Sequence, residues 1–320
     1  MYYLGVDLGG TNLVAGVVSQ EYRLINKVSV KTPHNVSGDE LCDAIALLCN
    51  LVLQEADIVW SDVHSVGIGV PGGANSIDGT VDYMVNLFMH NWPLKASMEQ
   101  RLQKPVHIAN DANAAAWGEF MAGSLVGTTN AIMITIGTGI GGGIIINKQI
   151  YQGCNYNGGE VGCMVIQVID GTHCNCGRSG CWEQYASACA LTRLTKKMMI
   201  DEKENAETLF SIAHGEIDKV NGKTAFDAMR AGDKLGTNIV KCYIEFLGCG
   251  IVNLVNIFQP DALCIGGGIG AEGEYLLAPL REILEKERIS KYSTVQTHLC
   301  CAKLRNDAGI IGAATLHINL

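Results

Sequence analysis

The segment from Asn157 to Glu183 holds the densest group of side chains in the sequence that can do chemistry. Its two carboxylates, Glu160 and Glu183, enclose four cysteines, which are Cys163, Cys174, Cys176 and Cys181. The last three follow the pattern Cys-x-Cys-Gly-x-x-Gly-Cys, and thiols this close among turn-forming glycines are typical of a tetrahedral zinc site. We therefore expect a zinc knuckle that fixes both carboxylates in one pocket.

A second candidate is Asp111, which follows the short apolar strand 106–109 and precedes a helix at 114–121. Capping that helix is one role open to the Asn110-Asp111 pair. Catalysis is the other, because a side chain at the carboxyl end of a strand faces the crevice in which open α/β sheets bind ligands. A carboxylate there can take the proton from a sugar hydroxyl as that hydroxyl attacks phosphorus.

A glycine-rich turn near the start of the sequence joins two apolar strands, 2–6 and 13–18. The turn reads Asp7-Leu8-Gly9-Gly10-Thr11-Asn12. Backbone N–H groups and the Thr11 hydroxyl at the tip of such a hairpin can cradle phosphate oxygens. Asp7 beside them can hold Mg²⁺ through water. A hairpin without any ligand is the alternative interpretation.

The strand–turn–strand pattern recurs at 130–147, where Gly137–Gly143 separates two apolar runs. Two domains that face each other with such hairpins can grip the phosphates of a nucleotide from both sides. Neither turn has the Lys-Ser/Thr ending of a Walker loop or the strand-to-helix placement of a Rossmann fingerprint, so both of those sites are disfavoured. A third glycine loop, Gly266–Gly270, follows the strand 262–265 and suits close approach by a flat adenine ring.

Hydrophobic periodicity places the elements that must position these residues. It predicts strands at 21–31, 63–70 and 295–301, and helices at 39–56, 185–199, 208–214, 224–230, 235–255, 276–287 and 307–317. Pro71-Gly72-Gly73 is a turn that can bring the backbone close to a ligand, and 79–91 is predicted as a loop. Gly309, Gly312 and Ala313 would let the last helix pack closely against another element.

Composition limits the class of protein. The 320 residues suggest about two domains. The net charge of −9 and the pI near 5.4 argue against nucleic acid or an acidic membrane surface as a partner. No apolar run spans a bilayer without polar residues or glycine, and MYYLGVDLGG lacks the features of a signal peptide, so we expect a cytoplasmic protein. Of the 13 cysteines, the nine outside the knuckle are interpreted as buried, reduced thiols.

Taken together, the motifs DLGGTN, PGG, NDANAAAWGE, TIGTGIGGG, GGEVG, CNCGRSGCWE and IGGGIG resemble, in this order, the ROK family (repressors, open reading frames, kinases) of sugar kinases, and within it the bacterial glucokinases. The resemblance covers nearly the whole sequence. It implies an actin-like, ribonuclease-H-like α/β fold of two domains around a central cleft. It also implies transfer of the γ-phosphoryl group of ATP to a hexose hydroxyl, usually O6, with Mg²⁺.

The resemblance also divides the chain. We expect a small N-terminal domain of residues 1–117 and 307–320, with the first phosphate loop and the catalytic aspartate. A larger domain of residues 118–306 would hold the second phosphate loop, the knuckle and the adenosine loop. Homodimers are common in the family, and helices of the second domain are the expected interface.

The resemblance assigns roles to particular residues. Asp111 becomes the catalytic base, and the sugar-binding residues become Gly73, Asn86, Asn110, Asp111, Glu160 and Glu183. The first phosphate loop consists of Asp7, Gly9, Gly10, Thr11 and Asn12, the second of Thr138, Gly139 and Gly141, and the adenosine loop of Gly267 and Gly268. Cys174, Cys176 and Cys181 match three zinc ligands. A sugar needs several fixed hydrogen-bond acceptors, and two carboxylates and an amide supply them.

Cys163 is a departure from the family pattern, which usually has histidine at this position as a ligand of zinc and of the sugar. Cysteine is an equally good zinc ligand, so we expect a site of four thiolates, with His173 as the competing fourth ligand. A metal-bound thiolate is a weak acceptor for a sugar hydroxyl. Cys163 therefore leaves the identity of the sugar open. The resemblance to glucokinases makes glucose the first expectation, and N-acetylhexosamines, allose and fructose are the alternatives.

Two other classes of function are weighed against a kinase. A sugar-sensing repressor of this family would carry a helix-turn-helix before the first phosphate loop, whereas this sequence starts with the strand itself. A non-catalytic scaffold is disfavoured because Asp111 and both phosphate loops are intact. The motifs leave the phosphoryl donor open between ATP, another nucleotide and polyphosphate.

Overall fold

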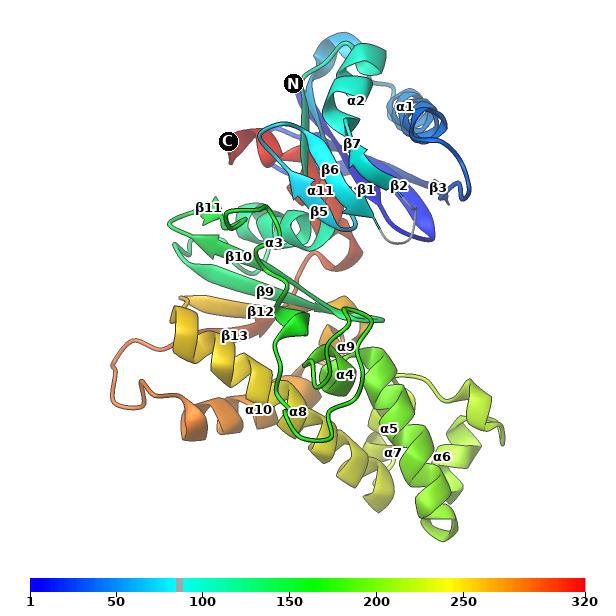
Figure 1. Cartoon of the computed structure of the whole chain (residues 1–320), viewed down its shortest axis with the longest axis vertical. Coiled ribbons are helices and arrows are strands. Elements are labelled where there is room, and N and C mark those ends of the chain that lie inside the picture. Colours follow the sequence, from blue (N-terminus) through cyan, green and yellow to red (C-terminus); the bar gives the residue numbers. More distant parts are fainter. Residues whose placement is uncertain (85–88, 320) are drawn as a thin grey trace. The chain divides into compact units, whose positions relative to one another are not determined.

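The computed structural model describes residues 1–84 and 89–319, which form two α/β units (Figure 1). The first unit comprises Met1–Met133, Gly142–Gly159 and Ala302–Leu320, and the second comprises Ile134–Gly141 and Glu160–Cys301. Residues 118–133 and 142–159, which were predicted for the larger domain, thus belong to the first unit. The functional division at residues 117 and 307 stays a prediction. Asn86 lies outside the described residues.

The first unit is built on a five-stranded sheet with the order β3-β2-β1-β4-β8. Its strands are β1 (Tyr2–Leu8), β2 (Asn12–Ser19), β3 (Leu24–Lys31), β4 (Val63–Val70) and β8 (Val106–Asn110). The β1–β2 and β2–β3 pairs are antiparallel, and β4 and β8 run parallel to β1. The carboxyl ends of β1, β4 and β8 therefore meet at one edge of the sheet, which is where ligands bind in open α/β sheets.

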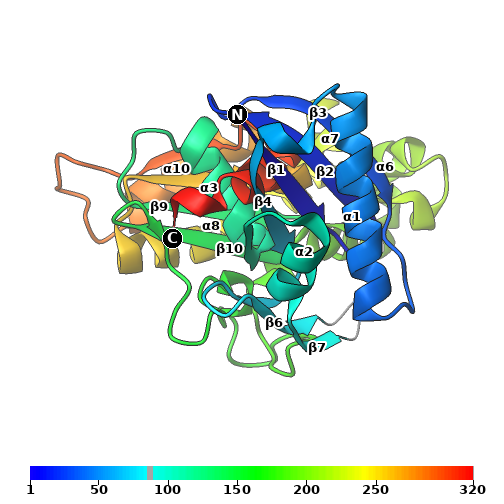
Figure 2. The same cartoon turned by 90° about the horizontal axis from the view of Figure 1, so that it is seen from above.

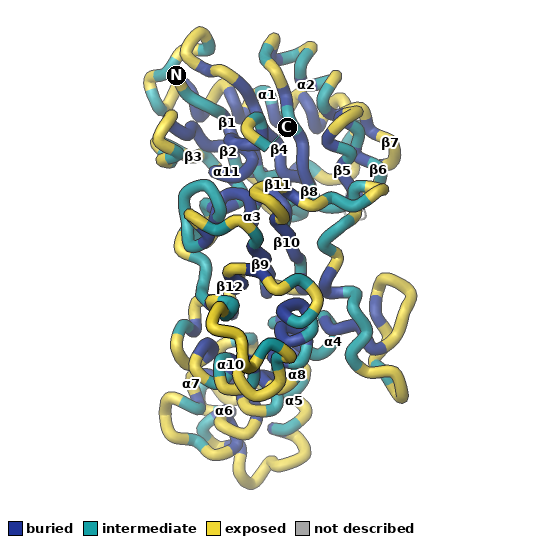
Figure 3. The backbone as a smooth tube through the Cα atoms, turned by 90° about the vertical axis from the view of Figure 1, so that its left-hand side faces the viewer, coloured by how far each residue is buried: buried dark blue, intermediate teal, exposed yellow. Residues whose placement is uncertain are grey.

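Alternating side chains give this sheet two different faces. Leu4 and Val6 point into a core shared with α1 (Gly38–Glu55) and α2 (Leu94–Leu102). Figure 2 shows α1 running alongside β2 and β3, which it contacts. Figure 3 shows β1, β2 and β4 as largely buried, whereas β3, at the edge of the sheet, is intermediate or exposed along its length. The sequence analysis did not predict α2.

The opposite face of the sheet is lined by glycines and receives α11 (Ala308–Ala314). Gly5 and Gly67 are register partners on β1 and β4. A Cβ at Gly5 would lie 1.9 Å from the Ile310 carbonyl oxygen, and one at Gly67 would lie 1.7 Å from that of Ala313. Only glycine allows this close approach. The predicted close packing of the last helix is therefore confirmed, and α11 packs in turn against α3 (Asp111–Ala122).

A small antiparallel sheet corrects one prediction. The segment 79–91 was predicted as a loop, but it contains β6 (Thr80–Met84) and β7 (Met89–Trp92), which pair with each other, and β6 pairs also with β5 (Gly73–Asn75). Val81, Met84 and Trp92 are buried in the core of the unit. These strands are too short and too rich in polar residues for their alternation to stand out in the sequence.

The other five-stranded sheet has the order β11-β10-β9-β12-β13. Its strands are β9 (Ala131–Ile136), β10 (Ile140–Ile146), β11 (Gln149–Ile150), β12 (Ala262–Gly266) and β13 (His298–Cys301). The boundary between the two units passes through β9 and β10. The strand predicted at 295–301 is shorter in the structure, where β13 begins at His298.

The second unit is mostly helical. Its helices are α4 (Glu183–Ala186), α5 (Ala188–Asp201), α6 (Glu207–Ile212), α7 (Thr224–Arg230), α8 (Lys234–Phe258), α9 (Gly267–Gly270) and α10 (Glu274–Glu287). The single helix predicted at 185–199 is interrupted at Ser187, whose extended backbone and side chain cap α5. By length and composition α8 could cross a membrane, but most of its apolar window is buried against α5, α7 and α10.

The cysteines outside the knuckle are less uniform than predicted. Cys42 and Cys49 on α1 are buried, as expected, whereas Cys154 and Cys189 are exposed. Exposure of these two corrects the interpretation that all nine are core thiols. Cys154 lies in a segment without apolar periodicity, and Cys189 lies at the exposed start of α5.

Candidate active site

Asp7 and Asp111 lie together at the carboxyl edge of the first sheet. Asp7 is paired in register with Gly69 of β4, and Asp111 directly follows β8. Burial, and then the charge of Asp111, raise the pKa of Asp7 to about 6. Burial likewise raises the pKa of Asp111 above its ordinary value of 3.8. Two desolvated carboxylates side by side are the kind of arrangement that enzymes use for proton transfer and cation binding.

Asn110, rather than Asp111, caps helix α3. The Asn110 Oδ1 accepts the N–H groups of Ala112 at 2.9 Å and Asn113 at 3.2 Å. Its Nδ2 donates to the Gly72 carbonyl oxygen at 3.1 Å, so it also fixes the Pro71-Gly72-Gly73 turn. The capping role is therefore filled by Asn110, and the Oδ1 of Asp111 accepts the N–H of Ala112 at 2.8 Å. The backbone N–H of Asp111 and the side chain of Asn110 also favour its charged form, although burial outweighs them. Asp111 stays available for chemistry.

The first glycine-rich turn is a tight hairpin between β1 and β2. The Gly9 N–H donates to the Asn12 carbonyl oxygen at 3.0 Å, and the Thr32 hydroxyl donates to the Gly9 carbonyl oxygen at 2.6 Å. Thr11 and Asn12 are exposed at the tip. The turn therefore has the hairpin form expected from the sequence, and its role as a phosphate cradle stays a prediction.

Gly309 of α11 shapes the surroundings of Asp7. A Cβ at Gly309 would lie 3.2 Å from Asp7 Oδ2, so a larger residue would crowd the carboxylate. The sequence analysis assigned Gly309 a packing role only. Its contact with Asp7 joins residues from opposite ends of the chain, and no local pattern signals it.

The second glycine-rich turn, between β9 and β10, is joined directly to the end of the knuckle. Glu183 Oε2 accepts the N–H of Ile140 at 3.0 Å. A Cβ at Gly139 would lie 2.1 Å from the same carboxylate oxygen, so a larger residue here would force Glu183 or the loop to move. Gly137 and Thr138 are exposed at the tip. Glu183, predicted as a sugar ligand, thus also holds the turn that was predicted as the second phosphate loop.

Three of the predicted zinc ligands lie within reach of one ion. The sulfur atoms of Cys174, Cys176 and Cys181 are all within 4.8 Å of one another, and those of Cys176 and Cys181 are 3.5 Å apart. Two thiolates on a tetrahedral zinc, with Zn–S bonds of about 2.3 Å, are roughly 3.8 Å apart. The donor set therefore fits zinc.

Cys163 lies close enough to Cys176 to affect its pKa, but it is not one of the three thiols whose sulfur atoms lie within 4.8 Å of one another. Burial raises the pKa of Cys163 to about 12, whereas the backbone N–H of Arg178 lowers that of Cys176 to about 7. His173 is exposed and is not part of the sulfur group that the described residues form. Glu160 is also exposed, and it opens the short helical turn that ends at Cys163.

The adenosine loop predicted at Gly266–Gly270 forms the short helix α9 after the buried strand β12. Gly267 has φ of +79°, and its Cβ would lie 2.3 Å from the Ile136 carbonyl oxygen, so glycine is required. Gly268 is exposed, and no atom lies within 4 Å of the position a Cβ would take. The backbone here offers the open surface that a flat ring needs.

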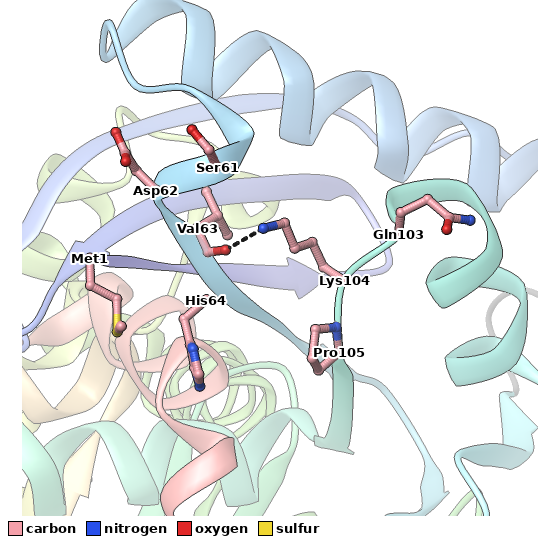
Figure 4. A pocket seen from close by; sticks show the side chains of 8 residues that line it. All are labelled: Met1, Ser61, Asp62, Val63, His64, Gln103, Lys104 and Pro105. Carbon is pink, nitrogen blue, oxygen red and sulfur yellow. Dashed lines mark hydrogen bonds between the residues drawn. The ribbon is translucent and has the colours of Figure 1, made fainter.

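A surface pocket of about 570 Å³ lies away from these residues (Figure 4). Its lining includes His64, which is at the start of β4, and Lys104 and Pro105, which precede β8. It is thus at the amino ends of the strands whose carboxyl ends carry Asp7 and Asp111. The Lys104 ammonium donates to the Val63 carbonyl oxygen at 2.7 Å. The chemistry predicted from the sequence is at the other end of the sheet.

Glycine-tipped hairpins, a carboxylate at a strand-to-helix junction and mixed α/β units define an actin-like sugar-kinase fold. The ROK family model matches residues 3–319. A glucokinase of Streptomyces coelicolor is 37% identical over 313 residues, covering 98% of this chain and 96% of its own. The N-acetyl-D-glucosamine kinase of Pectobacterium atrosepticum is 31% identical over 329 residues, covering 99% of each chain.

A solved structure gives the same result. A ROK family glucokinase from Streptomyces griseus, in complex with glucose and AMPPNP, superimposes with a TM-score of 0.83 at 37% identity and 99% coverage of both chains. The chain belongs to the ROK family. The predicted family and the actin-like α/β fold are both confirmed.

Proposed function

We propose that this protein is an ATP-dependent sugar kinase that phosphorylates a hexose hydroxyl, with O6 of glucose as the first expectation and Asp111 as the general base. The observation that carries the proposal is the buried carboxylate of Asp111 at the start of α3, beside Asp7 at the carboxyl edge of the sheet. The glucokinases among its relatives support the same activity.

Asp111 would accept the proton of the attacking hydroxyl. Its raised pKa makes it a stronger base than an exposed aspartate, and the Ala112 N–H fixes its orientation. Asn110 has its oxygen occupied by the helix cap, so it would meet the sugar through the second hydrogen of Nδ2. Glu160, Glu183, Gly73 and Asn86 would supply the other sugar contacts.

Asp7 and the glycine hairpins would bind the phosphate end of ATP. The first hairpin would supply Gly9, Gly10, Thr11 and Asn12, and the second Thr138, Gly139 and Gly141. Asp7 would hold Mg²⁺ through water. The site fits a cation because Asp7 and Asp111 are both desolvated, and a cation would stabilise their ionised forms. Bound Mg²⁺ neutralises charge on the transferring phosphoryl group. Gly267 and Gly268 would lie against the adenosine.

Cys163, Cys174, Cys176 and Cys181 would hold a structural zinc ion. All four donors are sulfur, and three already lie at spacings that fit one ion. The zinc would brace the segment that carries Glu160 at one end and Glu183 at the other. Because Glu183 is bonded to Ile140, the same brace would extend to the second phosphate loop.

The sugar itself stays a proposal. Glucose is the first expectation, and an N-acetylhexosamine is the alternative that one relative supports. Cys163 cannot offer the sugar the acceptor that histidine would. A panel of glucose, N-acetylglucosamine, N-acetylmannosamine, allose and fructose, assayed by ADP release, decides between them. We further propose that the protein works in the cytoplasm as a homodimer.

Asp111→Asn tests the catalytic assignment. We expect kcat to fall roughly 100- to 10,000-fold, because removal of a general base typically loses that factor, while calorimetry shows sugar binding retained. Asp62→Asn, an exposed carboxylate at the other end of the sheet, is the matched control. The acid limb of kcat/KM in the wild type should begin above the 3.8 of an ordinary aspartate. Retained turnover in Asp111→Asn would overturn the proposal.

A further inference from the structure

An ion pair between a buried carboxylate and an arginine whose side chain is 33% exposed lies next to the predicted adenosine loop and has no role in the site described above. Glu272 lies two residues after α9, and its side chain is only 5% exposed. A buried carboxylate is strongly destabilised unless it is paired and hydrogen bonded. Its partner is Arg230, the last residue of α7, whose Nη2 contacts Glu272 Oε2. The pair joins two elements that are far apart in the sequence.

The guanidinium of Arg230 is fixed on three sides. Besides Glu272, its Nη1 donates to Asp227 Oδ1 at 2.6 Å, and its Cζ lies 5.0 Å from the centre of the Tyr275 ring. A planar guanidinium can bridge two carboxylates and stack on a ring at the same time, which a lysine ammonium cannot do. Arg230 is thus held rigidly, and so is the carboxylate it contacts.

The backbone of Glu272 continues the turn that begins at Gly267. The Glu272 N–H donates to the Ile269 carbonyl oxygen at 3.1 Å, and the Ala271 N–H donates to that of Gly268 at 3.4 Å. Three of the four residues of α9 are glycine, which has the greatest conformational freedom to lose on folding. The turn cannot hold itself in place through side chains of its own, apart from the buried Ile269.

We propose that Arg230 and Glu272 are positioning residues for the adenosine half of ATP. Their ion pair fixes the end of the Gly267–Gly270 turn and thereby the open backbone surface at Gly268. The inference rests on the proposed function, in which Gly267 and Gly268 meet the adenosine. It places the effect on nucleotide binding and leaves the sugar contacts and proton transfer at Asp111 untouched.

Steady-state kinetics of Arg230→Met, Arg230→Lys and Glu272→Gln test this. Loosening the turn should raise the KM for ATP about tenfold in Arg230→Met, which corresponds to the loss of one well-placed contact. The KM for the sugar and kcat should stay within about twofold of the wild type. Calorimetry with ADP should show the same loss of affinity. Arg230→Lys should behave like Arg230→Met. The lysine ammonium cannot bridge Asp227 and Glu272 while stacking on the Tyr275 ring, as the planar guanidinium does.

Arg281→Met is the matched control. Arg281 pairs with Glu274 at 2.7 Å on the same stretch of chain, but the two side chains are 40% and 69% exposed. Loss of such a surface pair has little effect. We expect the KM for ATP to be unchanged in this variant.

The outcomes separate the inference from the proposed function. An unchanged KM for ATP in folded Arg230→Met overturns the inference, and so does an equal rise in the KM for both substrates, which would mean general loosening. If Arg230→Met fails to fold, Glu272→Gln gives the measurement, because an amide of the same size needs no buried counter-charge. A wild type that phosphorylates no sugar overturns the proposed function alone, since ADP calorimetry on the same variants still decides the role of the pair.

Discussion

The carboxylate of Glu183 accepts the backbone N–H of Ile140 at 3.0 Å. This bond ties the end of the cysteine-rich segment to the turn that holds Thr138 and Gly139. A residue predicted to bind the sugar therefore also sets the position of a loop predicted to bind phosphate. Both substrates of the proposed reaction would depend on the same carboxylate.

Gly139→Ala should disturb this link. A Cβ at residue 139 would lie 2.1 Å from Glu183 Oε2, which forces either the loop or the carboxylate to move. We expect kcat/KM for ATP to fall about tenfold or more, as misplacement of a positioning group does in other enzymes. The measurement is the ADP-release assay at saturating sugar.

Gly137→Ala is the control for that variant. It lies two residues away in the same turn, no atom is within 4 Å of the position its Cβ would take, and it has no positive φ. Its kinetics should match the wild type. Equal losses in both variants would mean that the turn tolerates no side chain at all, and that the contact with Glu183 is not the reason.

Asp7→Asn should stabilise the protein at neutral pH. The pKa of Asp7 is about 6 in the folded state and 3.8 as an ordinary value. Between pH 3.8 and 6, the folded protein keeps the Asp7 proton while the unfolded chain loses it. The contribution of Asp7 to the free energy of unfolding is therefore fully present below pH 3.8 and is lost as the pH rises through 6. A shift of two units corresponds to about 3 kcal/mol.

Urea denaturation without Mg²⁺, at pH 4 and pH 7.5, measures this effect. The gain in the free energy of unfolding of Asp7→Asn over the wild type should be large at pH 7.5 and small at pH 4. The same substitution should weaken Mg²⁺-dependent turnover. A gain that is equal at both pH values would mean that it comes from packing and not from the charge.

The fold was largely predictable because its signals are local. The apolar strands and the glycine turns of both hairpins are visible as runs, and so is the strand-to-helix junction at Asp111. The pairing of β6 with β7 was missed because both strands are short and carry polar residues such as Asp82 and His90. The break at Ser187 between α4 and α5 was not predicted. A serine can cap the start of a helix, but within a continuous apolar pattern it cannot be told from an ordinary polar position on the helix surface.

The tertiary contacts that position the candidate site residues could not be predicted from the sequence. Glu183 and Ile140, Arg230 and Glu272, and Asp7 and Gly309 are each brought together by tertiary packing between elements far apart in the chain. Motif matching assigned a residue such as Glu183 one role, toward a ligand. Only the structure adds the second role, toward the backbone of a neighbouring loop.

Metal analysis of the purified protein should find about one zinc ion per chain, bound through the clustered thiols. Cys181→Ser should lose the metal and lower the melting temperature, because Cys181 is fully buried and lies 3.5 Å from Cys176. Cys154→Ser, an exposed thiol outside the cluster, should change neither. Cys163→His should keep the metal, because imidazole is also a zinc ligand. Zinc-free protein with full activity and stability would remove the proposed site.

Asn110 has two functions that substitution can separate. Asn110→Ala removes the helix cap, which typically lowers the free energy of unfolding by about 1 kcal/mol, and also removes the Nδ2 bond to Gly72. Asn110→Asp keeps an oxygen for the N–H groups of Ala112 and Asn113 but has no N–H to donate to Gly72 or to a sugar. We expect Asn110→Asp to retain most of the stability that Asn110→Ala loses, while both variants raise the KM for the sugar. Thermal denaturation and the sugar titration measure the two effects separately. A normal KM for the sugar in Asn110→Asp would show that Asn110 serves the cap alone.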